Sequence, residues 1–261
     1  MNLVFDIGNT NIKVGLFHED KLVDSMRLAS SSSKTGDEYW LLLCDMFALK
    51  QIGVKDIKGV VISSVQPNLN YTIEHMVAYY IGVKPLIVGG GIKCGLNIKY
   101  DNPKEVGADR IVGSVAAYYT YGGPCIVLDC GTATTFNVIS EKGEFLGGPI
   151  SFGLKHAADA LSHSAAKLPK IELNFPPSVV GKNTISNMQS GILYGYVGLI
   201  EYIIHKIKAE TGDAKVIATG GISEIVGKNS KAIDVLDRTL TLRGLNIIYK
   251  LNKTGKSQLP R

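Results

Sequence analysis

Two similar turns, about half a chain apart, constrain the fold of this sequence more than any other feature. The first, Asp6-Ile-Gly-Asn-Thr-Asn-Ile-Lys13, follows the apolar run Leu3-Val4-Phe5 and precedes another strand-like stretch. The second, Asp129-Cys-Gly-Thr-Ala-Thr-Thr135, follows Ile126-Val127-Leu128 and also leads into a strand-like run. Glycine permits a tight turn, and short polar side chains place donors beside it. The repeat of strand, aspartate, glycine and hydroxyl predicts a duplicated fold.

The residue types in these turns suit phosphate and a metal ion. A carboxylate at the end of a strand, beside a donor-rich turn, can hold a hydrated metal against phosphate oxygens. Lys13 can add a mobile positive charge on the same phosphates. One such turn alone is also compatible with a β-hairpin that exposes a single aspartate. The second copy favours a nucleotide clamped by two halves of the chain.

Composition and charge exclude several other classes. Of the 261 residues, 45% are hydrophobic and 20% are charged, which is ordinary for a globular protein of one large or two small domains. The net charge is +5, but the basic residues are scattered, which argues against a nucleic-acid footprint. The four cysteines show no C-x-x-C pair and no histidine at metal spacing, so we expect core thiols of a reducing compartment. No signal-like segment or stretch of membrane-spanning length is present, which predicts a cytoplasmic protein without a membrane partner.

The hydrophobic pattern predicts strands and helices that repeat their order. In the first half we expect strands over 12–17, 21–28, 60–62 and 86–88, a helix opened by the capping box Thr35-Gly-Asp-Glu38, and helices over 69–81 and 111–119. In the second half we expect strands over 124–129, 133–139, 144–150 and 216–218, a helix with His156 and His163, a long helix over 187–210, and a last helix from Leu242. The polar tail 254–261 is expected to fray. Mixed sheets flanked by helices follow, in domains 1–120 and 121–261.

Three other features have two interpretations each. Asp109 and Arg110 stand near a helix start, where they form either a local ion pair, which spacing alone favours, or a general base beside a residue that orients an anionic substrate. Thr219-Gly-Gly221 follows a strand, and its glycines allow either an ordinary turn or the approach of backbone to a purine. Gly191, Gly195 and Gly198 in the long helix predict close packing, within the chain or across a dimer interface.

Together these motifs resemble the acetate and sugar kinase/Hsp70/actin superfamily and, more narrowly, the type III pantothenate kinases. The matching elements span residues 6 to 245 and are Asp6–Lys13, Gly107-Ala-Asp-Arg110, Asp129–Thr135, Gly147-Gly148, Gly181-Lys-Asn-Thr184, Gln189-Ser-Gly-Ile192 with Tyr194-Gly195, and Thr219-Gly-Gly221. Gly-Ala-Asp-Arg discriminates best among them. The resemblance implies duplicated ribonuclease H-like domains of the actin-like ATPase type, each a mixed β-sheet flanked by helices, with a nucleotide cleft between them.

The resemblance also implies a role for each matching position. ATP would be bound by Asp6, Ile7, Gly8, Asn9, Thr10, Asn11, Ile12, Lys13 and Thr132. Asp6 would hold Mg²⁺ through water, and Asp129 would hold a monovalent cation, K⁺ or NH₄⁺. The pantothenate pocket would be lined by Tyr100, Gly107, Ala108, Asp109, Arg110 and Thr184. Thr184 would come from the partner subunit of a homodimer that holds substrate at its interface.

The implied reaction is ATP-dependent phosphorylation of pantothenate to 4′-phosphopantothenate, the first step toward coenzyme A, with Asp109 as general base. Two alternatives stay open: a kinase of another small hydroxyl acceptor, and a regulatory protein of transcription. Gly-Ala-Asp-Arg and Gly-Lys-Asn-Thr argue against the first, and the lack of a helix-turn-helix or basic arm argues against the second. One departure is Phe152-Gly153 where the family usually carries Pro-Gly, which we expect to affect fine specificity more than the reaction.

Overall fold

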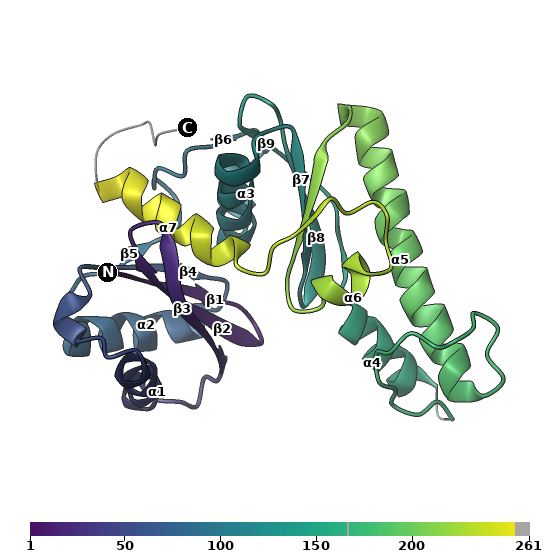
Figure 1. Cartoon of the computed structure of the whole chain (residues 1–261), viewed down its shortest axis with the longest axis horizontal. Helices are drawn as coiled ribbons and strands as arrows, with labels where there is room; N and C mark the ends of the chain where they lie inside the picture. The colour runs from purple at the N-terminus through teal and green to yellow at the C-terminus, as the bar shows by residue number, and fades with distance from the viewer. Residues whose placement is uncertain (166, 254–261) are drawn as a thin grey trace. The chain divides into compact units, whose positions relative to one another are not determined.

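The structure is a computed structural model that describes residues 1–165 and 167–253. The chain forms two compact units, which Figure 1 labels by their elements. Unit 1 comprises residues 1–121 together with the described residues from Thr239 onward, and unit 2 is Gly122–Arg238. The predicted fraying of the tail 254–261 lies outside the described residues.

Unit 1 is built on a five-stranded sheet of order β3-β2-β1-β4-β5. The predicted antiparallel meander is confirmed as β1 (Asn2–Ile7), β2 (Asn11–His18) and β3 (Lys21–Ala29). β4 (Gly59–Ser64) is parallel to β1, and β5 (Leu86–Ile87) is parallel to β4. The remaining elements of this unit are α1 (Gly36–Leu49), α2 (Pro67–Met76), a π-helical turn (Val77–Ile81), β6 (Asn97–Ile98), α3 (Ala108–Tyr121), α7 (Leu240–Lys253) and the 3₁₀ turns Val54–Asp56 and Pro103–Glu105.

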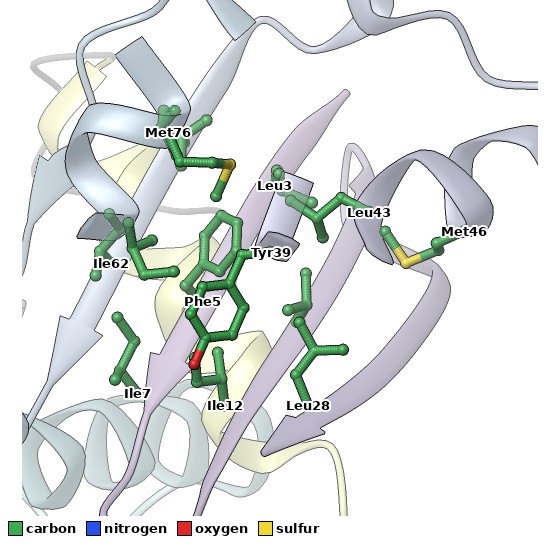
Figure 2. Packing of buried hydrophobic residues seen from close by; sticks show 14 of the residues in the cluster. Leu3, Phe5, Ile7, Ile12, Leu28, Tyr39, Leu43, Met46, Ile62 and Met76 are labelled. Atoms are coloured by element: carbon green, nitrogen blue, oxygen red, sulfur yellow. The ribbon is translucent and has the colours of Figure 1, made fainter. Parts of the chain in front are cut away.

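One face of this sheet forms the main core of unit 1 together with α1 and α2. Leu3, Phe5 and Ile7 of β1 point to this face and are buried. Figure 2 shows Tyr39 of α1 among them, and its hydroxyl lies 3.1 Å from the carbonyl oxygens of Ala29 and Ser31. Because side chains alternate along a strand, Asp6 points to the opposite face.

The opposite face of the sheet is covered by α3 and α7. α7 contacts β1, β2 and β4, and it packs on α3, as the yellow helix in Figure 1 shows. Gly244 of α7 approaches α3 so closely that a Cβ there would overlap the carbonyl oxygen of Val112. The expected division into 1–120 and 121–261 therefore differs from the structure, which assigns this last helix to unit 1. An amphipathic pattern shows that a helix packs, but it does not show against which sheet.

Unit 2 repeats the strand plan of unit 1. Along the order β12-β11-β7-β8-β9, the strands β7 (Cys125–Cys130), β8 (Ala133–Ile139) and β9 (Glu144–Gly147) are antiparallel. β11 (Lys215–Thr219) is parallel to β7, and β12 (Val235–Leu236) is parallel to β11. The predicted duplication is confirmed. The helices of this unit are α4 (Leu154–Ser164), α5 (Thr184–Thr211) and α6 (Ser223–Gly227), and residues of α4 and α5 share a core with β7, β8 and β11.

The predicted strand over 144–150 is divided in the structure. β9 ends at Gly147, and β10 (Ile150–Phe152) pairs with β8. Gly148 has a φ of 133°, and a Cβ there would overlap the carbonyl oxygen of Phe136. The break therefore depends on a backbone conformation and a close approach that favour glycine.

Candidate active site

The first turn places Asp6 in a row of polar side chains at the carboxyl end of the unit 1 sheet. Asp6 lies opposite Lys13 of β2 and Ser63 of β4. Its Oδ2 is 3.3 Å from the Nζ of Lys13, and its side chain is only 8% exposed. The Nζ of Lys13 is also 3.4 Å from Oγ1 of Thr241 on α7. We call Lys13, Asp6 and Ser63 the unit 1 row.

The backbone of the first turn is held by Ser30, the residue after β3, while two side chains of the turn stay exposed. The amide of Gly8 donates to the carbonyl oxygen of Asn11 at 3.0 Å. The Ser30 hydroxyl donates to the carbonyl oxygen of Gly8 at 2.7 Å, and the Ser30 amide donates to that of Thr10 at 3.0 Å. Asn9 and Thr10 are exposed. The turn is thus held in shape with polar groups at the surface, as phosphate binding requires.

Two of the residues expected to bind ATP cannot do so through their side chains. Ile7 and Ile12 are opposite each other in the β1–β2 pair, and both are buried in the core of unit 1. Only their backbone groups remain for a ligand. Only the polar residues of this turn can contact a ligand through their side chains.

Asp109 lies in the first turn of α3, which begins three residues earlier than predicted. The amides of Arg110 and Ile111 donate to the carbonyl oxygen of Gly107, at 3.1 and 3.3 Å, so Gly107 directly precedes the helix and accepts its first hydrogen bonds. Oδ1 of Asp109 accepts from the Arg110 amide at 2.8 Å. A Cβ on Gly107 would be 2.6 Å from this oxygen, so glycine leaves room for the carboxylate.

The pKa of Asp109 is raised above its ordinary value. Burial is the largest cause, and the nearby carboxylate of Asp6 is the second. The amide of Arg110 and its buried guanidinium act in the opposite direction but do not prevail. A carboxylate with a raised pKa is a better base near neutral pH, and such shifts cluster at functional sites. This favours the general-base interpretation of Asp109 over the simple ion pair.

Unit 2 carries an equivalent row at the end of its own sheet. Asp129 of β7 lies opposite Thr135 of β8 and Thr219 of β11. Thr219 is fully buried, and its Oγ1 has no hydrogen-bond partner in the part of the chain that the structure describes. Gly220 has a φ of 99°, and a Cβ there would be 2.5 Å from both Oδ1 of Asp129 and the carbonyl oxygen of Cys130. A carboxylate, a hydroxyl and a carbonyl oxygen are donors that fit a hard cation.

The remaining candidate residues lie at the following places. Thr132 is exposed in the turn between β7 and β8, and Thr184 is the exposed first residue of α5. Tyr100 is half-buried in the connection between β6 and α3, close in sequence to the Asp109 segment. Unit 1 thus brings together Asp6, Lys13 and Asp109, while Asp129, Thr132 and Thr184 belong to unit 2.

Sequence reasoning missed the buried hydroxyls of Ser63 and Thr219. Each hydroxyl lies within the last two residues of a strand that is parallel to the strand of an aspartate. Recognising this requires the strand pairing, which the sequence alone does not give.

The Phe152-Gly153 departure from the family pattern lies directly behind the second turn. Phe152 is half exposed, and its carbonyl oxygen accepts from the Thr134 hydroxyl at 2.9 Å. A Cβ on Gly153 would be 2.6 Å from the carbonyl oxygen of Gly131 and would overlap that of Thr132. The φ of Gly153 is an ordinary −80°, which other residues also adopt. Glycine is therefore needed here because of the close approach and not because of the backbone conformation.

Replacing Gly153 with alanine is expected to displace the second turn and to weaken ATP binding. Overpacking of this kind typically costs about 1–3 kcal/mol, and if all of it opposes binding we expect a rise of roughly 5–150-fold in the Kd for ATP. Equilibrium binding of a fluorescent ATP analogue measures it. Gly90→Ala is the matched control, because a Cβ there meets nothing within 4 Å. Equal affinities for the two variants would show that Gly153 does not support the turn.

Two general findings concern the described residues as a whole. No cluster of three or more His, Cys, Asp or Glu side chains suited to a metal ion occurs among the described residues. Mg²⁺ usually keeps several waters and is held by one or two carboxylates with substrate phosphates, so the single carboxylate of Asp6 in the unit 1 row fits it. None of the helices in the described ranges is long and apolar enough to span a membrane.

The duplicated sheets, each with an aspartate near the end of its first strand, are the arrangement expected of the actin-like fold of kinases and ATPases. Several solved structures match nearly the whole chain. A putative Baf family transcriptional activator from Campylobacter jejuni has a TM-score of 0.60 at 19% identity, covering 96% of this chain and 98% of its own. The activator of 2-hydroxyisocaproyl-CoA dehydratase from Clostridium difficile, with bound ADPNP, has a TM-score of 0.58 at 11% identity, covering 100% and 98%. A putative N-acetylmannosamine kinase from Listeria monocytogenes has a TM-score of 0.52 at 13% identity, covering 97% and 99%.

At these identities the likeness shows the fold alone. The family is shown by a separate comparison, in which the model of type III pantothenate kinases matches residues 2–206. The chain belongs to the type III pantothenate kinase family, and it is a nucleotide-binding kinase of the actin-like fold. The resemblance seen in the sequence is confirmed.

Proposed function

We propose that this protein transfers the γ-phosphoryl group of ATP to the primary hydroxyl of pantothenate and forms 4′-phosphopantothenate. The observation that carries the proposal is Asp109, a carboxylate with a raised pKa beside the unit 1 row, in the Gly-Ala-Asp-Arg segment of a chain of this family. Phosphoryl transfer needs mainly positioning and charge stabilisation, to which a base adds about 10²–10⁴-fold.

In this proposal Asp109 accepts the proton of the attacking hydroxyl. Burial supports this role because it raises the pKa of the carboxylate toward the pH at which a base works best. Arg110, which is 7% exposed, would orient the carboxylate of pantothenate through its fixed donors. Tyr100, Gly107 and Ala108 would line the same pocket.

The phosphates of ATP would be held by the first turn, Lys13 and Thr132. Asp6 would hold Mg²⁺ through water, and the bound ion would neutralise charge on the phosphate oxygens. The position of Lys13, 3.3 Å from Asp6, supports a shared phosphate site because one side chain attracts the metal and the other the phosphate.

A monovalent cation, K⁺ or NH₄⁺, would bind at Asp129. The buried Oγ1 of Thr219 and the close approach of Gly220 support this part of the proposal. A buried hydroxyl without a partner costs about 1–3 kcal/mol, and a cation beside the carboxylate would remove that cost. Thr219 would then be a further oxygen donor of the site.

A homodimer would complete the substrate site through Thr184. Gly191, Gly195, Gly198 and the 61%-exposed Tyr202 are spaced along one face of α5. A Cβ on any of the three glycines would meet nothing within 4 Å of the described structure, so the close packing expected within the chain is not present there. An exposed face of this kind supports an interface with a second copy.

Replacing Thr184 with alanine is expected to raise the KM for pantothenate by about 2–10-fold, the effect of one lost hydrogen bond. The KM for ATP should change by less. The helix start should survive because Asn183, not Thr184, caps it by accepting from the Ser186 amide at 2.9 Å. Steady-state kinetics with each substrate varied in turn measures both constants, and an equal change in the two would argue against a specific pantothenate contact.

The test of the proposed function is ADP release from ATP and Mg²⁺, with and without pantothenate, in potassium and then in sodium buffer. We expect release that needs both pantothenate and potassium. Release without pantothenate would point to another acceptor or to an ATPase. No release from folded protein in any buffer, together with a salt-dependent shift of DNA, would favour the regulatory alternative.

A further inference from the structure

The hydroxyl of Ser63, at the end of β4, is buried without a hydrogen bond. Ser63 is 1% exposed, and its Oγ finds no partner in the described ranges of the chain. The next residue differs, because the Ser64 hydroxyl accepts from the Gln66 amide at 3.0 Å and lies 3.3 Å from its carbonyl oxygen. Leaving a buried hydroxyl unsatisfied costs about 1–3 kcal/mol, so the side chain needs an explanation.

Strand pairing places Ser63 beside Asp6. In the parallel β1–β4 pair Asp6 is opposite Ser63, and in the antiparallel β1–β2 pair it is opposite Lys13. Paired residues point to the same face of a sheet, so the three side chains form one row on the face that α3 and α7 cover. The Ser63 hydroxyl therefore belongs to the surroundings of the Asp6 carboxylate.

The same arrangement occurs in unit 2. Thr219 is opposite Asp129 in a parallel pair, and its Oγ1 also lacks a partner among the described residues. The two units share strand order but not sequence at these positions, with serine in one and threonine in the other. Both units thus have a buried hydroxyl beside the aspartate near the end of the first strand. In both places the missing hydrogen bond lowers the stability of the free protein.

We propose that Ser63 is a further residue of the metal–phosphate site, where its Oγ hydrogen-bonds a water of the hydrated divalent cation that Asp6 holds. This rests on the proposed kinase function. A phosphate oxygen is a poorer occupant, because the adjacent Asp6 carboxylate repels it. The water of a cation suits the place, because such a water donates to the carboxylate and to the hydroxyl oxygen alike. Ser63 thereby orients the water of the cation relative to Asp6.

The test compares Ser63→Ala and Ser63→Thr with the wild type in binding and in stability. Binding of Mn²⁺ in the presence of ADP is followed by the electron paramagnetic resonance of free Mn²⁺, and ADP binding without metal is measured by calorimetry. We expect Ser63→Ala to weaken metal-dependent binding by about 3–10-fold, with metal-free ADP binding unchanged. Ser63→Thr should stay within about twofold of the wild type, because it keeps the hydroxyl and Thr219 occupies the equivalent place.

Thermal unfolding of the free protein gives a second readout. A purely structural role of Ser63 predicts a lower Tm on substitution, whereas the proposed role predicts a Tm that does not fall. Ser63→Ala should have a Tm equal to or above that of the wild type, because it removes an unsatisfied group. The control Ser230→Ala should lower the Tm, because that buried hydroxyl donates to Glu201 Oε1 at 2.9 Å. If Ser63→Ala fails to fold, the isosteric pair Ser63→Thr and Ser63→Val gives the same comparison of hydroxyl with methyl.

Three outcomes would overturn the inference. They are unchanged Mn²⁺ binding in Ser63→Ala, an equal loss of ADP affinity with and without metal, and a Tm that falls as far as in Ser230→Ala. A wild type that binds no metal with ADP would instead contradict the proposed kinase function, and the inference would fail with it.

Discussion

Replacing Asp109 with asparagine is expected to lower kcat by about 10²–10⁴-fold, the usual contribution of a general base. Nucleotide binding should change little, because the amide oxygen of asparagine can still accept from the Arg110 backbone, as Oδ1 of Asp109 does at 2.8 Å. Steady-state turnover and the Kd for ATP measure the two effects. Full activity in this variant would remove Asp109 from the role of base.

The same substitution should not destabilise the protein at neutral pH. The pKa of Asp109 is raised by burial and by Asp6, so its contribution to the free energy of unfolding is fully present only below the unfolded-state pKa of about 3.9. That contribution is lost as the pH rises through the raised pKa of the folded state. Asparagine carries no charge to bury, so thermal unfolding at pH 7 should give a Tm equal to or above that of the wild type. A clear drop in Tm would show that the carboxylate stabilises the fold.

Replacing Asp6 with asparagine is expected to lower kcat by about 10²–10³-fold, the effect of removing one preorganised electrostatic group. It should also act on Asp109, whose pKa is raised in part by the Asp6 charge. In the pH profile of kcat/KM, the acidic limb reports the ionisation of the base, so it should move to lower pH in this variant. Asp109→Asn should abolish that limb instead of moving it.

Asp24→Asn is the matched control for this prediction. Asp24 also pairs with a lysine, Lys50 at 3.7 Å, but both side chains are more exposed than those of Asp6 and Lys13. Surface pairs of this kind contribute about 0–1 kcal/mol, so turnover and the pH profile should match the wild type. An acidic limb that stays in place in Asp6→Asn would contradict the coupling of the two carboxylates.

The sequence predicts the strand meanders well because each turn carries its own signals. Asp6 through Asn11 and Asp129 through Thr132 combine glycine, short polar residues and flanking apolar runs, and the structure has turns at both. The capping box at Thr35 is equally local, and α1 begins at the next residue. Local chemistry thus defines where these elements begin and end.

Long-range contacts explain what could not be predicted. The packing of α7 in unit 1 depends on the close approach of Gly244 to the backbone of Val112. The second turn is supported by the close approach of Gly153 to the backbone of Gly131 and Thr132. The position of Ser63 beside Asp6 follows only from the parallel pair β1–β4, and that of Thr219 beside Asp129 only from the parallel pair β7–β11. Parallel pairing joins segments far apart in the chain, and a single sequence carries no local signal for it.

The role of Asp109 was open to two interpretations in the sequence, and its burial in the structure favours a general base over a surface ion pair. Adjacent acidic and basic residues at a helix start are common on surfaces, where they form weak pairs. Here Arg110 is buried and the pKa of Asp109 is raised, because burial and Asp6 outweigh the nearby guanidinium. Burial follows from the packing of α3 on α7 and β4, which lies beyond what residue spacing can indicate.

The most direct test of the central claim is the identity of the phosphorylated product. The wild type and Asp109→Asn are incubated with ATP, Mg²⁺ and pantothenate in potassium buffer, and the products are followed by mass spectrometry and ³¹P NMR. We predict that the wild type adds one phosphoryl group to the primary hydroxyl of pantothenate and that the variant adds little or none. Unmodified pantothenate in the presence of folded wild-type protein that binds Mg²⁺ and nucleotide would contradict the account.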